Sequence, residues 1–442
     1  MMREFKFFSL LFCAGFAPGQ AEHASATVRA DVLYMTVPEV IERVKGQNLE
    51  LLIRKEGVRR ALEQSYQRRA ALLPQIGFSA SQTRTQLARG FISEQFDSPP
   101  FNSFGSRVVG SIHLIDAQHF ADWRIAKLEH AIEALDYEVA LQDVLDQVIM
   151  LYFTHLRNLR QVEIYEGNLA REERLFELAE AQFAAGVAVK IEVTRAAVRR
   201  AAVQRDLMEA RTEADDSILQ LKALLDIDLS RELTLDRSIV DEIKSPPALE
   251  NYGKMLDLME VRPELESQQK LLDRAILAKR AVNWQHLPTI GLFAEWGYDT
   301  NEAFDGDEGE AWLAGIQASM PIWEGGRIAA ERREAKAAIR QNRRAMRQLE
   351  LQIQREFQFA LLEMRSRYSQ IEFARNEVRL GMDEVEQARE RYQEGLADNT
   401  ELIDAQQRLA DAERSQLRAI YLYGLSRLAF ARAIGSVERV LD

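Results

Sequence analysis

An internal duplication constrains this chain more than any other feature. Residues 183–193 recur as 392–402, and residues 73–77 recur as 287–291. In each half a Leu-Pro block precedes two strand-like segments and then a very long helical segment that ends at a glycine turn. A repeat of this size makes the half-chain the architectural unit, so each motif is one of a pair.

Composition narrows the class of protein. Of the 442 residues, 29% are charged and 47% are hydrophobic, which is typical of a folded chain and not of a disordered one. The net charge of −12 argues against a nucleic-acid partner, which requires a basic face, and fits a water-filled surface that favours cations. Proline is absent between Pro100 and Pro246 and after Pro321, so unusually long helices can form there.

The first residues have the pattern of an export signal. Arg3 and Lys6 precede an apolar stretch, and small residues at 24–26 supply a cleavage site, so we expect a signal peptide over 1–26. Cys13 is the only cysteine and would leave with it, unless it is lipidated. No later stretch approaches the roughly 18–20 apolar residues of a membrane-spanning helix. The mature chain is therefore expected to be periplasmic, secreted, or embedded in an outer membrane.

The duplication gives a division of the chain into segments. We expect a first repeat over 27–230, a connector over 231–260 and a second repeat over 261–442. The first repeat should hold a helix, a β-hairpin and a helical hairpin over 36–72, 75–116 and 122–225, and the second the same order over 262–285, 288–323 and 326–434. Apolar residues step by three and four along the long helical segments, which indicates coiled-coil packing.

The second β-hairpin has the pattern of membrane strands. Each strand has about ten residues with apolar and polar side chains in alternation. Aromatic residues stand at both ends of the apolar band, as in the two girdles of a transmembrane barrel: Trp296, Tyr298 and Trp312 beside an acidic loop, and Trp284 and Trp323 at the opposite end. The first hairpin is more polar. The alternative is an ordinary amphipathic hairpin that covers a soluble core.

Element lengths predict an oligomer. A helix over 326–391 is on the order of 100 Å long, which exceeds the thickness of any single-domain core. Four strands per chain cannot close a membrane barrel, since the smallest have about eight, and an open edge in lipid leaves backbone groups unsatisfied. The barrel must therefore be shared between chains.

The motifs resemble those of the TolC-type outer-membrane efflux proteins over the whole mature chain. The resemblance rests on the duplicated order and on Arg262-Pro-Glu-Leu265, Leu287-Pro288, Met320-Pro-Ile-Trp-Glu-Gly-Gly-Arg327, and Tyr392-x-x-Gly395 followed by Glu401-Leu402-x-x-Ala405. It implies a mostly α-helical α+β membrane protein. The resemblance further implies a homotrimer with a 12-stranded barrel in the outer membrane and an α-helical coiled-coil tunnel through the periplasm. The first half departs from the pattern, because Ile115-Asp116 stands where the second half has the Pro-Ile-Trp-Glu-Gly-Gly run.

Three residues near the second glycine turn are candidates for a channel gate. Glu401 and Asp404 are one helical turn apart, so they share a face, and by resemblance they match the acidic residues that line the periplasmic aperture. Stacked carboxylate rings would favour cations. The alternative is helix capping, with Asp398 and Glu401 as a capping box. Tyr392 is expected either to hold the closed tip by hydrogen bonds to a neighbouring hairpin or to pack in the core.

The two turn glycines have a structural and a functional interpretation. Gly186 and Gly395 can adopt the left-handed conformation that ends a helix and lets the chain reverse. By resemblance, these turns form the tip that docks a periplasmic adaptor and an inner-membrane pump. In the first half the pair equivalent to the gate acids is Glu192 and Arg195, so only the second hairpin would supply an acidic ring.

No catalytic, cofactor or metal motif is expected. The histidines are scattered, and His113, Asp116 and His119 lie at a strand-to-helix junction without a recognised ligand spacing. We therefore interpret the chain as the passive exit duct of a tripartite efflux pump in a Gram-negative outer membrane. The exit duct of a type I protein secretion system and a coiled-coil scaffold without a pore are the alternatives.

Overall fold

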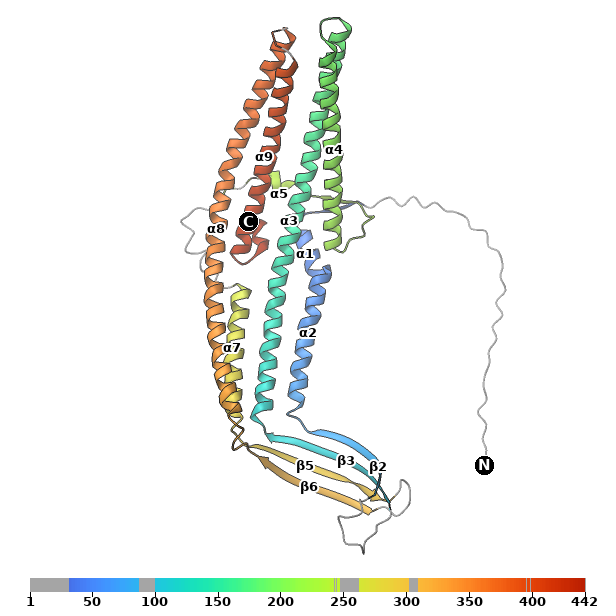
Figure 1. Ribbon diagram of the computed structural model, residues 1–442, viewed down its shortest axis with the longest axis vertical. Coiled ribbons are helices and arrows are strands. Elements are labelled where there is room, and N and C mark those ends of the chain that lie inside the picture. The colour runs from blue at the N-terminus through green and yellow to red at the C-terminus, as the bar shows by residue number, and fades with distance from the viewer. Residues whose placement is uncertain are drawn as a thin grey trace, which may run out of the picture.

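The computed structural model describes residues 32–86, 100–241, 243, 245–246, 262–301, 309–394, 396–397 and 399–441. The expected signal peptide and most of residues 242–261 lie outside them. The molecule is elongated, with a β-sheet at one end and two helical hairpins reaching toward the other (Figure 1). It confirms the expected mostly helical α+β architecture.

Two helices give the molecule its length. α3 (Ala117–Ala184) has 68 residues and α8 (Arg327–Gln393) has 67, so each is about 100 Å long. α4 (Lys190–Leu224) folds back along α3, and α9 (Asn399–Ala433) folds back along α8. α2 (Leu49–Ala70) packs on the sheet-proximal half of α3, and α7 (Pro263–Trp284) lies against both α3 and α8 (Figure 1).

The expected single helix over 36–72 is interrupted at Asn48. α1 (Val37–Gln47) ends there and α2 begins, because the backbone of Asn48 is extended (φ −62°, ψ 124°). The Asn48 side chain accepts a hydrogen bond from the Leu51 backbone N–H at 3.1 Å and donates one to the Leu224 carbonyl at 2.8 Å. A buried amide with both partners satisfied caps the second helix and stabilises the break.

The connector forms a small parallel sheet that the sequence analysis did not predict. β1 (Leu33–Met35) pairs with β4 (Leu233–Leu235), and α5 (Ser238–Asp241) follows. The buried ends of these strands join a core formed by α1, α3 and α4, which contains the fully buried Tyr152. The Tyr152 hydroxyl donates to the Asp236 carbonyl at 2.6 Å, so this contact ties the connector after β4 to the first helical hairpin.

The two β-hairpins form one antiparallel sheet with the strand order β2-β3-β5-β6. The strands are β2 (Gln75–Thr85), β3 (Phe101–Ile115), β5 (Thr289–Thr300) and β6 (Gly309–Ser319). Register places Ile112, Leu292 and Ile316 in one cross-strand row, and Val108, Trp296 and Trp312 in another. These rows lie on an apolar face that is strongly exposed, since Ile316 is 72% exposed and Trp312 is 74% exposed.

The opposite face of the sheet is polar. Arg107 on β3 pairs with Asp299 at 2.8 Å and with Glu295 at 3.6 Å, both on β5. An apolar face backed by a polar face is the arrangement that the alternating sequence pattern predicted. Within the described ranges, no helix combines the length and the apolar composition needed to cross a membrane.

Candidate functional site

The tip of the first helical hairpin turns at Gly186, which has a φ of +74°. The Val187 N–H donates to the Gln182 carbonyl at 3.0 Å and the Gly186 N–H to the Phe183 carbonyl at 2.9 Å, which closes a Schellman-type cap. An added Cβ on Gly186 would meet nothing within 4 Å, so the turn needs glycine for its backbone conformation and not for space. Gly395, its predicted counterpart, lies outside the described residues.

Tyr392 both packs in a core and contacts the other helical hairpin. Its ring is buried against Leu175, Leu402 and Ala405 in a small core at the tip. Its hydroxyl donates a hydrogen bond to the Gln182 side chain in the other helical hairpin, 210 residues away in sequence. Burial, with the nearby charge of Glu192, raises the pKa of the Tyr392 phenol, so the hydroxyl keeps its proton at neutral pH.

Glu401 and Asp404 are both exposed on the first turns of α9. Glu401 pairs with Arg391 on α8 at 3.0 Å, across the turn of the same hairpin. Asp404 lies close enough to Arg408 for its charge to help raise the pKa of that guanidinium, after the larger effect of the hydrogen bond to Glu384. The capping-box alternative stays untested because Asp398 lies outside the described residues. The two candidate gate acids are therefore bordered by arginines.

Two further contacts join the first helical hairpin to α9 of the second, one at the tip and one farther along the helices. Arg195 on α4 donates to the Thr400 hydroxyl on α9 at 3.3 Å. Arg171 on α3 pairs with Glu413 on α9 at 2.7 Å, and both side chains are mostly buried. The sequence analysis missed these partners, because single charged residues on charge-rich helices carry no signal of what faces them.

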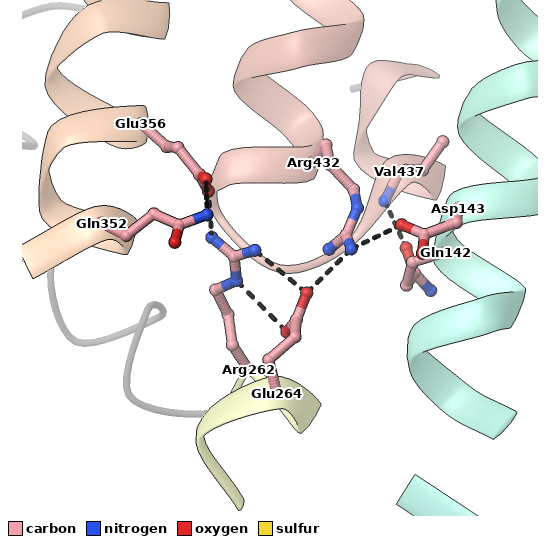
Figure 2. Close-up of polar contacts among 8 residues, drawn as sticks. All are labelled: Gln142, Asp143, Arg262, Glu264, Gln352, Glu356, Arg432 and Val437. Atoms are coloured by element: carbon pink, nitrogen blue, oxygen red, sulfur yellow. Dashed lines mark hydrogen bonds and ion pairs between the residues drawn. The ribbon is translucent and has the colours of Figure 1, made fainter. Parts of the chain in front are cut away.

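A second polar cluster, which we name the α7 network, joins four helices near the middle of the molecule (Figure 2). Arg262, at the start of α7, binds Glu264 through two nitrogens at 3.0 and 3.3 Å and reaches Glu356 on α8 at 3.2 Å. Glu264 also pairs with Arg432 on α9 at 2.8 Å, and Arg432 pairs with Asp143 on α3 at the same distance. The Arg-Pro-Glu-Leu motif thus anchors α7 to both helical hairpins.

The α7 network contains buried charged side chains, and the pKa of Glu264 among them is strongly lowered. The Arg262 and Glu264 side chains are only 6% and 15% exposed. Burial alone would raise the pKa of Glu264, but the hydrogen bonds and charge of Arg262, with the charge of Arg432, outweigh it and lower the pKa to about 2. Pro263 at the first helical position fixes the start of α7 and so the place from which both charged side chains extend.

A family model and known proteins match this chain. The sequence model of the outer membrane efflux protein family matches residues 40–226 and 257–436, which is most of the chain. This protein belongs to the outer membrane efflux protein family. Membership confirms the predicted resemblance and the predicted outer-membrane location.

Individual members of the outer membrane efflux protein family match at low identity. The alkaline protease secretion protein AprF of Pseudomonas aeruginosa is 24% identical over 82% of this chain and 77% of AprF. The toluene efflux pump outer membrane protein TtgF of Pseudomonas putida is 24% identical, but the match covers 59% of this chain and only 54% of TtgF. The CmeC outer membrane channel of Campylobacter jejuni superposes with a TM-score of 0.78 at 18% identity, over 90% of this chain and 85% of CmeC.

The aromatic residues proposed for a membrane interface gather at the two ends of the sheet in this efflux-family chain. At the far end Trp296 faces Trp312 across β5 and β6, stacks edge-to-face on Tyr298 at 5.5 Å, and donates to Glu310 at 2.9 Å.

At the helical end of the sheet, Trp323 is 84% exposed. Trp284 lies near Phe120, which in turn packs on Trp123. The sequence analysis overlooked this last pair, and the membrane role of all these residues stays a prediction.

One group of metal-ligand side chains occurs in the part of this efflux-family protein that the structure describes. His113, Asp116 and His119 bring their ligand atoms within 4.8 Å of one another. The sequence spacing of these residues did not predict this proximity, because the turn between β3 and α3 brings the three side chains together.

Proposed function

We propose that this protein is the subunit of a passive outer-membrane exit duct for small molecules. The observation that carries the proposal is the direct continuation of a sheet with one exposed apolar face into helices about 100 Å long. The apolar face suits lipid, and the helices are long enough to cross much of a periplasm. No energy-coupling motif was found in the sequence, so a partner must drive transport.

The duct is a homotrimer in this proposal. β2 and β6 end the strand order, and each pairs along one edge within the described residues. Pairing β6 of one copy with β2 of the next satisfies the backbone groups that lipid would otherwise leave without partners. Three copies then supply 12 strands. Trp296, Tyr298 and Trp312 would mark one membrane interface, and Trp284 and Trp323 the other.

Gating takes place at the helical tips in this proposal. A periplasmic adaptor docks on the hairpin turns at Gly186 and Gly395, and an inner-membrane transporter delivers the substrate. The contacts of Tyr392 with Gln182 and of Glu401 with Arg391 belong to the closed state. The adaptor opens the duct if it binds the state in which these contacts are released more tightly than the closed state.

Protein secretion is the second candidate function. The similarity to AprF, whose name states alkaline protease secretion, favours it and covers more of this chain than the similarity to TtgF does. One duct can serve either kind of cargo. A coiled-coil scaffold without a pore leaves the exposed apolar face of the sheet unexplained.

The purified oligomer in a planar lipid bilayer tests the proposal. We expect a trimer by native mass spectrometry and discrete channel openings of small, cation-preferring conductance, because acidic side chains stand at the tip. The oligomer denatured by heat and added in the same detergent is the control. A folded trimer that opens no channels would contradict the duct and favour the scaffold.

A further inference from the structure

At the junction between β3 and α3, the ligand atoms of three side chains lie close together. The carboxylate Oδ2 of Asp116 lies 2.6 Å from Nδ1 of His119 and 3.9 Å from Nδ1 of His113. The two imidazole rings are 4.9 Å apart between centroids. Two donors bound to one zinc ion in tetrahedral geometry lie about 3.4 Å apart, so the observed separations bracket the value that a shared ion requires.

Local backbone irregularity places His113 in this set. The pairing of β3 with β5 shifts register between His113 and Ile115, so Leu114 forms a bulge. A bulge turns the strand and redirects the side chains beside it. His113 pairs with Gly291 on β5, and an added Cβ there would stand 4.0 Å from its Nδ1, which is an ordinary van der Waals contact.

Asp116 is held in place independently of the two histidines' side chains. It is the N-cap of α3, and its Oδ1 accepts the His119 backbone N–H at 2.9 Å. Its side chain is 8% exposed, whereas those of His113 and His119 are 46% and 37% exposed. The second carboxylate oxygen therefore faces both imidazoles from a fixed position, and it already contacts Nδ1 of His119 at 2.6 Å.

We propose that His113, Asp116 and His119 bind a divalent transition-metal ion such as Zn²⁺ at this junction. Two imidazoles and one carboxylate match the ligands of three-residue zinc sites, with water completing the coordination. Imidazole also suits Cu²⁺ and Ni²⁺, whereas Mg²⁺ and Ca²⁺ prefer sites made of oxygen atoms. Within the described residues, no arginine or lysine pairs with Asp116, and its side-chain partners are the two imidazoles of the proposed site.

The bound ion would fasten the end of β3 to the first turn of α3. This is the place where the first half of the chain lacks the glycine turn of the second half, in which Gly325 and Gly326 adopt φ of 62° and 86° before α8. A helix cap needs only Asp116. A metal site also uses His113, which approaches from the end of β3.

Zinc binding by the intact detergent-purified oligomer, prepared without a polyhistidine tag, tests the inference. Equilibrium dialysis against Zn²⁺ should saturate at one ion per chain, and Co²⁺ should give a visible d–d absorption band. His113→Ala and His119→Ala should each weaken binding by about 10- to 100-fold or more. Asp116→Asn keeps the helix cap while removing the charge, and it should weaken binding as well.

His130→Ala is the matched control, because His130 lies on α3 outside the cluster. It should leave both the stoichiometry and the Co²⁺ band unchanged. A wild-type oligomer that binds no Zn²⁺, or whose binding is unaltered by loss of His113 or His119, would overturn the inference. Circular dichroism and native mass spectrometry establish that each variant compared is a folded oligomer.

Discussion

Replacing both Glu401 and Asp404 with alanine is expected to enlarge the single-channel conductance severalfold and to remove the preference for cations. The double substitution deletes two carboxylates per chain, or six per proposed trimer, and breaks the Glu401–Arg391 ion pair that crosses the hairpin turn. Arg391 and Arg408 stay behind, so the local charge becomes more positive. Conductance and reversal potential in a salt gradient across a planar bilayer measure both effects.

The control for this prediction removes two carboxylates elsewhere on the same helical hairpin. Asp383 and Glu386 on α8 are more exposed than Glu401, and each forms a long ion pair, at 3.8 and 3.9 Å, with an arginine on its own helix. The Asp383→Ala/Glu386→Ala variant should behave like the wild type. If both double variants shift conductance equally, the aperture assignment fails and net charge explains the result. If neither does, Glu401 and Asp404 act only at the start of α9.

Glu264→Gln is expected to destabilise the folded chain by about 3–5 kcal/mol. The substitution leaves Arg262 and Arg432 buried without the carboxylate that pairs with both of them. Glutamine is a neutral amide of similar size that keeps the packing, so the loss of stability measures the effect of removing the charge. Urea titration followed by circular dichroism gives the change in unfolding midpoint.

Glu356→Gln is the comparison for that experiment. Glu356 pairs with the same Arg262 at 3.2 Å but is 36% exposed, so we expect it to contribute at most about 1 kcal/mol. Similar midpoint shifts for Glu264→Gln and Glu356→Gln would show that the α7 network does not depend on its buried pair.

The lowered pKa of Glu264 also predicts a dependence on pH. The pKa falls from its ordinary value of 4.5 to about 2 on folding, so the unfolded chain binds the proton more readily. The stabilisation, about 3 kcal/mol, is therefore fully present above about pH 4.5 and is lost as pH falls toward 2. The stability difference between the wild type and Glu264→Gln should shrink across this range. A difference that stays constant from pH 6 to pH 3 would contradict the shifted pKa.

Much of the fold could be predicted because local sequence patterns specify it. The duplication gave the repeated order of hairpins, and the alternation at Ile290, Leu292 and Trp296 gave the apolar face that the sheet presents. The proline-free stretches allowed helices of the observed length. These features depend on neighbours in sequence. The interruption at Asn48 was missed, because it depends on a hydrogen bond to Leu224 at the end of a distant helix.

The candidate sites were only partly predictable. The sequence, read with the family resemblance, singled out Tyr392, Glu401 and the Arg-Pro-Glu-Leu motif. Their partners Gln182, Arg391 and Arg432 became known only when helices separated by up to 210 residues were packed together. Periodicity specifies which face of a helix is apolar, but not which charge on another helix faces it.

The sequence alone thus determined the repeat, the two kinds of hairpin and the face of the sheet that is apolar. Tertiary structure alone decided which polar groups meet: the tip contact of Tyr392, the four-helix α7 network and the convergence of His113 with Asp116 and His119. The physical reason is that burial patterns repeat with the local geometry of a strand or helix. Polar partnerships depend instead on register, on a single bulge and on how long helices cross, which no local pattern specifies.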